Sequence, residues 1–522
     1  MKRLLFVMLV LTVMFHPGVC GASARQTLEE DAASPASRLR PLLSVNSRWE
    51  GGPGGSYLAV DIPGEEDDVR DGNPEPVITE EPAAGWQFSD ALDRQFKALL
   101  FLEWTDPSDI PGNPGNTFLK IPEAGAQFHL RPDFRLNFET VTCQVKPRMT
   151  AGWSHWAGGL DRSDQEEIDV FMNEWSIRAS LTDWFFLILG RENLQWGPGY
   201  LGSLSNPFFS DNGKTNPQQE VPGMDFIRLV FMPDPLWTIS TIANIGKGAA
   251  DIPSDEFHSR YALKLDYCGT ASYAGLVLSC QESPGAFEMG CYAGITASDA
   301  LILYTEGMSS HHDTALLYPA TAPNPVGKGF ESRDYGLLEH GSFLLGGSYT
   351  TEAGPTVVLE YLFSGYGYTG AQASSYFEAI DIASSAYSID GASRLLADYQ
   401  SRLSGIPVPV NAPSLEKGAP SVQGLSTAVL GQAMKAGEPF LRRNYLMAQV
   451  HDSDVREIID YTVRYTHCLD DQSGQALLLL DIKATESTHV FSVFKTQFGR
   501  THSDFGSGIL DYYWMFGIQY DY

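Results

Sequence analysis

The stretch Gln127–Glu139, QFHLRPDFRLNFE, alternates apolar and polar residues over its whole length of thirteen residues. A period of two is typical of a β-strand, whose side chains point alternately to opposite faces. Strands of soluble proteins average about five or six residues, whereas a tilted strand that crosses a bilayer needs about ten. The stretch therefore predicts a membrane-spanning strand, with lipid on the side of Phe128 and Phe138 and a polar lumen on the other side.

The N-terminus, residues 1–24, has the form of a secretory signal peptide. A basic start and the apolar run Leu4–Phe15 precede Ala22-Ser23-Ala24, which fits the small residues of a cleavage site. No later segment has the roughly 18 uninterrupted apolar residues of a spanning helix. We therefore expect an exported chain that is either a soluble secreted protein or an outer-membrane β-barrel.

Composition favours the barrel. Of 522 residues, 12% are aromatic, 50 are glycine and only 19% are charged. The net charge of −29 argues against a nucleic-acid partner and fits acidic loops that face water. The six cysteines have no CxxC or Cys/His spacing, so we expect no metal and no cofactor.

The chain divides into a leader and a long run of strands. Residues 25–94 are rich in proline, glycine and acids, which predicts a poorly ordered periplasmic leader. Residues 95–522 predict an all-β fold, an antiparallel transmembrane β-barrel of about 18 strands. The expected strands are 95–106, 126–139, 141–156, 167–182, 184–197, 223–233, 237–248, 259–269, 271–283, 286–298, 300–311, 342–352, 356–369, 444–454, 457–471, 474–484, 489–500 and 505–522.

The connections between these strands alternate in length. Short turns, such as those at 182–183 and 298–299, alternate with connections that include every long one. Short turns on one rim and long loops on the other are typical of an outer-membrane barrel, and a soluble sandwich has no reason to sort its loops in this way. The long connections are 107–125, 157–166, 198–222, 249–258, 312–341 and 370–443.

The last strand, GILDYYWMFGIQYDY, alternates again and ends on the aromatic residue Tyr522. An aromatic C-terminal residue on an alternating strand resembles the assembly signal of bacterial outer-membrane proteins. This resemblance implies the bacterial outer membrane as the location, with membrane lipid and the barrel-assembly machinery as partners.

The polar faces of the four expected strands between residues 126 and 197 carry many charges. They predict a lumenal ladder that attracts small anions, such as carboxylated sugars. The alternative is that these charges pair across strands and only fill a polar lumen. The ladder consists of His129, Arg131, Asp133, Arg135, Lys146, Arg148, Glu174, Arg178 and Arg191.

Turn positions predict two cross-strand pairs. A turn centred between Thr182 and Asp183 places Glu174 opposite Arg191, which predicts a lumenal salt bridge with a structural or ligand-binding role.

A second turn, at Gly285-Ala286, places Cys280 opposite Cys291 on the apolar face. The periplasm permits disulfides, but direct cross-strand geometry can be strained. The two cysteines are therefore a candidate disulfide, with unpaired thiols as the alternative.

The connection 198–222 is unusually apolar for an exposed loop. With the residues just before it, it contains the motif Trp196-Gly197-Pro198-Gly199-Tyr200. Such a loop is expected to bury its apolar side chains in the barrel mouth, as a constriction, a plug or an aromatic platform for sugar rings. The alternative is an extracellular loop with a small core of its own.

Motifs around this loop resemble two families. They are Gly190-Arg191-Glu192, Trp196–Gly199, a following Asn-Pro pair, and Pro222–Asp225 with Arg228. This pattern resembles the outer-membrane capsule-assembly barrels and the alginate-export-like porins. The resemblance implies a porin-like or polysaccharide-linked role for the barrel.

The connection 370–443 has helical apolar spacing in its segments SSYFEAIDIASSAYS, ASRLLADYQSRL and LSTAVLGQAMKAGEPFLRRNYL. A loop of this length with its own helices is expected to be a lid, a docking surface or a cap on the barrel rim.

These observations lead to two functional hypotheses. The first is a porin-like channel for small hydrophilic or anionic solutes, including polysaccharide-related ones. The second is a closed barrel that binds or organises surface polysaccharide. We expect no enzyme, because the sequence contains no G-x-S-x-G nucleophile elbow between a strand and a helix.

Overall fold

The computed structural model describes residues 91–156, 164–209, 213–214, 218, 220–249, 257–282, 286–317, 330–334, 339–404, 407–410, 415, 418–436 and 440–522. The expected signal peptide lies outside the described residues. So does the expected leader 25–94, except for its last four residues.

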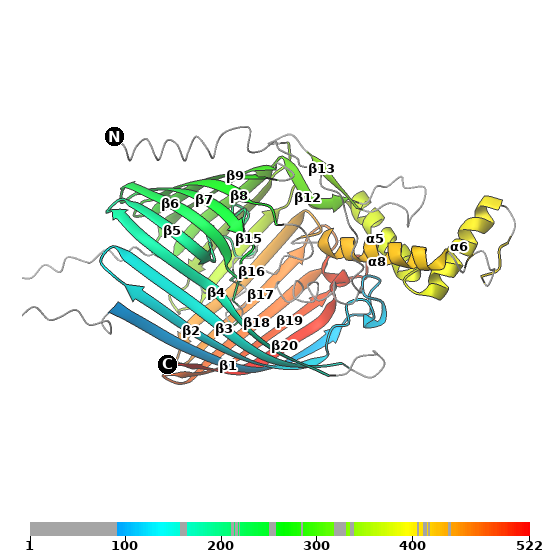
Figure 1. Ribbon diagram of the computed structural model, residues 1–522, viewed down its shortest axis with the longest axis horizontal. Helices are drawn as coiled ribbons and strands as arrows, with labels where there is room; N and C mark the ends of the chain where they lie inside the picture. The colour runs from blue at the N-terminus through cyan, green and yellow to red at the C-terminus, as the bar shows by residue number, and fades with distance from the viewer. Residues whose placement is uncertain are drawn as a thin grey trace, which may run out of the picture.

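Eighteen antiparallel strands form one closed barrel, as the sequence predicts (Figure 1). The barrel closes because β1 pairs with β20, for example Ala98 with Tyr520, as well as with β2. The strands are β1 (Leu92–Pro107), β2 (Ala124–Asn137), β3 (Val141–His155), β4 (Gln165–Thr182), β5 (Phe185–Glu192), β6 (Met224–Asp234), β7 (Trp237–Gly246), β8 (Arg260–Cys268), β9 (Ser272–Gln281), β10 (Phe287–Ser298), β11 (Leu301–Ser310), β14 (Ser342–Thr350), β15 (Thr356–Phe363), β16 (Asn444–Val455), β17 (Ile459–Cys468), β18 (Gly474–Thr485), β19 (Thr488–Phe498) and β20 (Leu510–Asp521).

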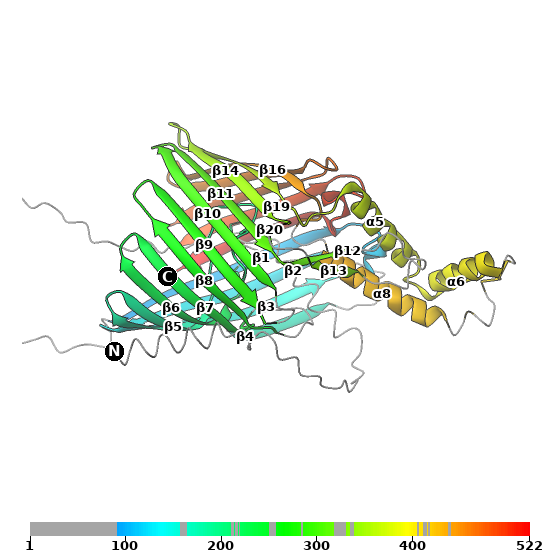
Figure 2. The ribbon, with the colours of Figure 1, turned by 90° about the horizontal axis from the view of Figure 1, so that it is seen from above.

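Each barrel strand overlaps one expected strand, although β5, β15 and β20 are shorter than predicted. A separate two-stranded sheet of β12 (His312–Leu317) and β13 (Glu331–Asp334) lies in a long connection. The helices and this small sheet lie at one end of the barrel, and the C-terminus lies at the other (Figures 1 and 2).

The strand β2 shows the predicted division into two faces. Phe128 is 37% exposed on the outer surface, whereas Arg131, three residues later, is 8% exposed. The outer face stays apolar around the barrel, with exposed residues such as Leu100, Leu345 and Leu359.

Aromatic side chains gather near both ends of this outer face. Towards the long-loop end, the rings of Trp104 and Trp514 are 5.3 Å apart. Near the short turns, Trp184 contacts Phe231 at 5.3 Å. Two aromatic girdles around an apolar band are typical of outer-membrane barrels, where the rings sit at the two lipid–water interfaces. The protein is therefore a barrel of the bacterial outer membrane.

The connection between β15 and β16 forms helices, as its spacing predicts. These are α5 (Gly370–Ser385), α6 (Ile389–Ser404) and α8 (Ala419–Ala436). Within the described part of the chain, no helix is long and apolar enough to span a membrane.

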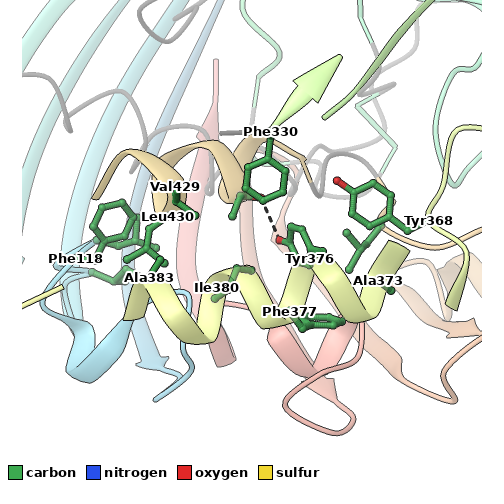
Figure 3. Packing of buried hydrophobic residues seen from close by; sticks show 14 residues of the cluster. Phe118, Phe330, Tyr368, Ala373, Tyr376, Phe377, Ile380, Ala383, Val429 and Leu430 are labelled. Carbon is green, nitrogen blue, oxygen red and sulfur yellow. Dashed lines mark hydrogen bonds between the residues drawn. The ribbon is translucent and has the colours of Figure 1, made fainter. Parts of the chain in front are cut away.

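Helices α5 and α8 share a small apolar core on the long-loop side (Figure 3). Tyr376 and Leu430 pack there with Phe118, from the β1–β2 connection, and with Phe330. The hydroxyl of Tyr376 donates to the carbonyl oxygen of Ala433 at 3.0 Å. This core joins the helices to a neighbouring loop of the rim, which fits a cap better than a freely moving lid.

The predicted pairing of Glu174 with Arg191 is wrong. A register irregularity between Ser180 and Thr182 places Trp175, instead of Glu174, opposite Arg191. Both side chains still lie beside Gly223, where a Cβ atom would be 3.0 Å from Arg191 Cγ and 3.2 Å from Glu174 Cγ, but Glu174 pairs with Lys146 and Arg191 with Asp225.

The candidate disulfide is also wrong. Cys280 lies opposite Phe287, and Cys291 lies opposite Leu276. The hairpin is centred two residues before the expected turn at Gly285-Ala286, so the two cysteines are not cross-strand neighbours and no disulfide joins them.

Candidate functional site

The connection between β5 and β6 folds into the lumen. Leu194 and Phe209 pack against the inward-facing Phe226 and Ile242 of β6 and β7, and the same cluster continues over β8 and β9. We call residues 193–223 the lumenal loop. Its apolar side chains explain why it leaves the solvent, because burial against the barrel wall removes them from water.

A second part of the lumenal loop reaches a different sector of the wall. Tyr200, Leu201 and Leu204 pack against a cluster that includes Leu344 and Met447 and extends over β11 and β14–β17. The loop therefore contacts two separated groups of strands.

Glu306 of β11 binds this loop through its carboxyl group and is only 1% exposed. Its Oε1 accepts hydrogen bonds from the backbone nitrogen and the hydroxyl of Ser205, both at 2.7 Å. The Ser203 hydroxyl donates to the same oxygen at 3.2 Å, and the Gly199 nitrogen lies 3.4 Å from Oε2.

Glu360 of β15 binds the neighbouring residues and is also 1% exposed. The backbone nitrogens of Tyr200 and Leu201 donate to its two oxygens at 2.7 and 2.9 Å. The hydroxyl of Tyr304 donates to Oε1 at 2.7 Å. Such bonds satisfy backbone groups that a loop inside a barrel would otherwise leave without partners.

Lys214 closes the loop on itself. Its ammonium group donates to the carbonyl oxygens of Gly197, Pro198 and Gly199 at 3.3, 3.1 and 3.0 Å. It also lies 5.0 Å from the centre of the Tyr200 ring. Burial lowers the pKa of Lys214, and the charges of Glu360 and Glu306 oppose that shift.

The end of the lumenal loop is attached to a third sector, at β2 and β3. Arg148 donates from Nε and Nη2 to the two oxygens of Glu220, both at 2.6 Å. Arg131 donates to the carbonyl oxygen of Gln218 at 2.6 Å. Burial alone would raise the pKa of Glu220, but the hydrogen bonds from Arg148 and the charge of Arg131 bring it below its ordinary value.

Much of the predicted charge ladder forms contacts within the barrel. Lys146 lies 3.1 Å from Glu174, and Arg148 Nη1 lies 2.9 Å from Asp133 without hydrogen-bond geometry. Arg131 Nη2 donates to Nδ1 of His129 at 3.1 Å.

Arg191 has partners outside the predicted ladder. Its Nε donates to Asp225 at 2.8 Å, and Nη1 donates to the carbonyl oxygen of Met172 at 2.8 Å. The neighbouring Arg228 forms a two-bond pair with Glu192, at 2.8 and 3.0 Å.

Two arginines of the ladder have no acidic partner within ion-pair distance among the described residues. Arg178 lies 4.4 Å above the ring of Phe186, and Arg135 donates to the side-chain oxygen of Asn137 at 3.1 Å. Both lie near the ends of strands that lead into short turns. Arg178 is close enough to Arg135 and Arg228 for like charges to repel.

Steric crowding explains why the loop motif has glycine at positions 197 and 199. Gly197 has a φ of 91°, and a Cβ atom there would lie 2.6 Å from Glu306 Oε1. At Gly199 a Cβ atom would lie 2.6 Å from the carbonyl oxygen of Gly202. Only glycine combines this conformation with such close approach to the carboxyl group.

The aromatic residues of the motif are occupied within the loop. Trp196 stacks edge-on with Phe208, and its indole nitrogen donates to the carbonyl oxygen of Ser205 at 3.2 Å. Tyr200 lies beneath Lys214 and Arg464. Pro198 and Gly199 are buried.

Glu306, Glu360, Lys214 and Glu220 were missed by sequence reasoning. Glu306 and Glu360 each stand as a lone acid in a largely apolar strand, LILYTEGMSS and TVVLEYLF, at a position that faces the lumen. That isolated charge was an available signal. Lys214 and Glu220 lie in a loop with no periodicity to indicate their direction.

Comparison with known proteins assigns no family to the chain. No family model matches the chain, and no curated protein matches it. Three solved structures from Pseudomonas aeruginosa show a weak likeness to the chain. OccK8 (OprE) has a TM-score of 0.45 and 10% identity, over 83% of this chain and 99% of the other.

OccK11 (OpdR) has a TM-score of 0.43 and 10% identity, over 83% and 96% of the two chains. OpdK, solved with vanillate, has a TM-score of 0.42 and 10% identity, over 82% and 98%. At these values the likenesses assign no family and no ligand to this chain. The resemblance to capsule-assembly and alginate-export barrels stays a prediction from the loop motifs.

Proposed function

We propose that the protein is a channel for small hydrophilic solutes, with a preference for anions, whose lumen is narrowed by the lumenal loop. The observation that carries this proposal is the pair Arg135 and Arg178. Most lumenal cations nearby are matched by acids, as Lys146 is by Glu174, but these two are not.

Unmatched cations on a channel wall favour anions for a physical reason. Water-filled lumens surrounded by lipid focus the field of the charges on their walls. Rings or rows of Arg and Lys side chains are the usual means by which pores select anions. The loop adds selection by size, because it is tied to three sectors of the wall and occupies part of the cross-section.

The experiment compares ion selectivity in planar bilayers for the wild type and for the double variant Arg135→Gln/Arg178→Gln. A salt gradient gives a reversal potential that reports anion over cation permeability. We expect the reversal potential of the double variant to show a lower ratio of anion to cation permeability than that of the wild type. The control is Arg402→Gln on α6, where the arginine lies in an exposed i,i+4 pair with Asp398.

An unchanged reversal potential in the double variant, with wild-type conductance, would contradict the proposal that these residues select ions. Native folding of each variant is checked by the heat-dependent change in electrophoretic mobility that folded barrels show.

A closed barrel that organises surface polysaccharide is the second candidate. The observation that favours it is the attachment of the lumenal loop to three sectors, which is suited to a plug. Trp196 and Tyr200 do not support it as a sugar platform, because their rings contact the loop and its cations. A folded wild-type barrel that never conducts would favour this candidate over the channel.

A further inference from the structure

A recess of about 310 Å³ lies on the long-loop side, apart from the lumen. One wall is a stripe along α5 that includes Gly370, Phe377, Glu378 and Asp381, and the other wall holds Arg442 and His502. Figure 3 shows Phe377 on the side of α5 away from Phe330. Phe377 and Ala373 belong to the apolar cap core and also line the recess, so the recess lies at the edge of that core.

Arg442 supplies an unmatched cation to this recess. It is 9% exposed, and its buried Nε has no hydrogen-bond partner among the described residues, nor does any described ion pair include it. A buried charge normally has a partner, because its removal from water is otherwise costly. Burial raises the pKa of the nearby Asp504 to about 7, so below that pH this acid does not offset Arg442.

The N-terminus of α5 lies at the same end of the recess. The backbone nitrogen of Tyr368 donates to the carbonyl oxygen of Leu441 at 2.7 Å, which brings the start of the helix beside Arg442. The first turn of α5 has no acidic residue, and a Cβ atom at Gly370 would meet nothing within 4 Å. A Thr369–Gln372 capping box satisfies part of this N-terminus, and the remaining backbone nitrogens keep the partial positive charge of a helix N-terminus.

The other end of the recess is acidic. Glu378 is exposed, and Asp381 lies 3.1 Å from His502 Nε2. The His502 ring stacks on Phe377 with centroids 5.3 Å apart. Glu378 is eight residues beyond Gly370, which is about 12 Å along a helix.

We propose that this recess binds a small zwitterion of the class of short peptides. The carboxylate pairs with Arg442 and the first turn of α5, and the ammonium group pairs with Glu378. An extended tripeptide spans about 10 Å, which suits the separation of the two ends. The proposal does not depend on conduction through the lumen.

The test measures binding of triglycine to the purified full-length barrel in detergent by isothermal titration calorimetry at pH 6. Two blocked peptides each lack one charge: N-acetyl-triglycine has no ammonium group, and triglycine amide has no carboxylate. The variants are Arg442→Gln and Glu378→Gln. The matched control is Asp398→Asn, an exposed acid on α6.

We expect triglycine to bind and each blocked peptide to bind at least tenfold more weakly. Glu378→Gln should weaken triglycine at least tenfold while leaving N-acetyl-triglycine unchanged, and Arg442→Gln should weaken both. Asp398→Asn should bind as the wild type does.

Absence of triglycine binding to the wild type would overturn the proposal. Equal affinities of Glu378→Gln and Asp398→Asn for triglycine would also overturn it, because binding would then lie elsewhere, for example in the lumen. If Arg442→Gln fails to fold, Glu378→Gln with the two blocked peptides still decides the outcome, since Glu378 is exposed on the helix surface.

Discussion

Glu306 and Glu360 stand on two different lumen-facing strands and bind consecutive parts of the same loop. Glu306 accepts from Ser203 and Ser205, and Glu360 accepts from Tyr200 and Leu201. The loop conformation therefore depends on two buried carboxyl groups instead of on regular secondary structure. This arrangement makes the width of the lumen sensitive to single substitutions on the wall.

Replacement of Glu360 by glutamine should loosen the lumenal loop and raise single-channel conductance. The amide keeps the size of the side chain, but its nitrogen cannot accept, so one of the two backbone donors loses its acceptor; a buried unsatisfied donor costs about 1–3 kcal/mol. Glu306→Gln should act in the same direction. The control is Glu486→Gln in a short exposed turn, which should conduct as the wild type does. If the wild type, the two lumenal variants and the control variant all have the same conductance, these carboxyl groups do not set the width of the lumen.

The attachment of Glu220 to Arg148 should survive mild acid. Because the folded-state pKa of Glu220 is lowered, its stabilising contribution is present above the ordinary glutamate pKa of about 4.3 and is lost only as pH falls below it. Conductance should therefore be constant between pH 7 and 5 and change only near pH 4 and below. Glu220→Gln should show the low-pH conductance already at pH 7. A wild-type transition near pH 6 would contradict this account.

Asp504 should make the loop between β19 and β20 less stable as pH rises. Burial raises its pKa to about 7, with the hydrogen bond from Tyr445 opposing the shift. The folded protein then holds a proton that an unfolded chain loses near pH 4, so stability falls between about pH 4 and 7, by about 4 kcal/mol at most.

Hydrogen exchange of residues 499–508 measures this effect. Exchange corrected for its intrinsic pH dependence should be faster at pH 8 than at pH 6 in the wild type and equal at both in Asp504→Asn. Asp299→Asn, in an exposed turn, should keep the wild-type difference. Equal protection at both pH values in the wild type would show that Asp504 is not protonated near neutrality.

The register of β9 and β10 can be tested by cross-linking. Leu276→Cys places a thiol directly opposite Cys291, and directly opposed residues have Cα atoms about 4.5–5.5 Å apart. Mild oxidation of this variant should form a disulfide between residues 276 and 291, detected by mass spectrometry of peptides. The wild type should form none between Cys280 and Cys291. A 280–291 disulfide would instead support the register expected from the sequence.

Sequence periodicity was sufficient to predict the barrel strands, because each strand faces lipid on one side and the polar lumen on the other along its whole length. The alternation in Gln127–Asn137 is continuous, and so its direction and both faces were predictable. The same holds for the alternation of short and long connections, which follows from the two sides of the membrane.

Register was not predictable where a local irregularity intervenes. One register irregularity near Thr182 places Trp175 opposite Arg191, and Arg191 forms its ion pair with Asp225 instead of the expected Glu174. The residues on either side of the irregularity give no sign of it in the sequence. The partners of the lumenal loop could not be predicted either, because they join strands far apart in the sequence. Arg148 and Glu220 are 72 positions apart, and Tyr200 and Glu360 are 160 apart.

The most direct test of the central claim is single-channel recording of the folded wild-type barrel in a planar bilayer under a salt gradient. The account predicts steady openings whose reversal potential shows that anions pass more easily than cations. A correctly folded barrel that stays silent, or one that conducts cations preferentially, would contradict it.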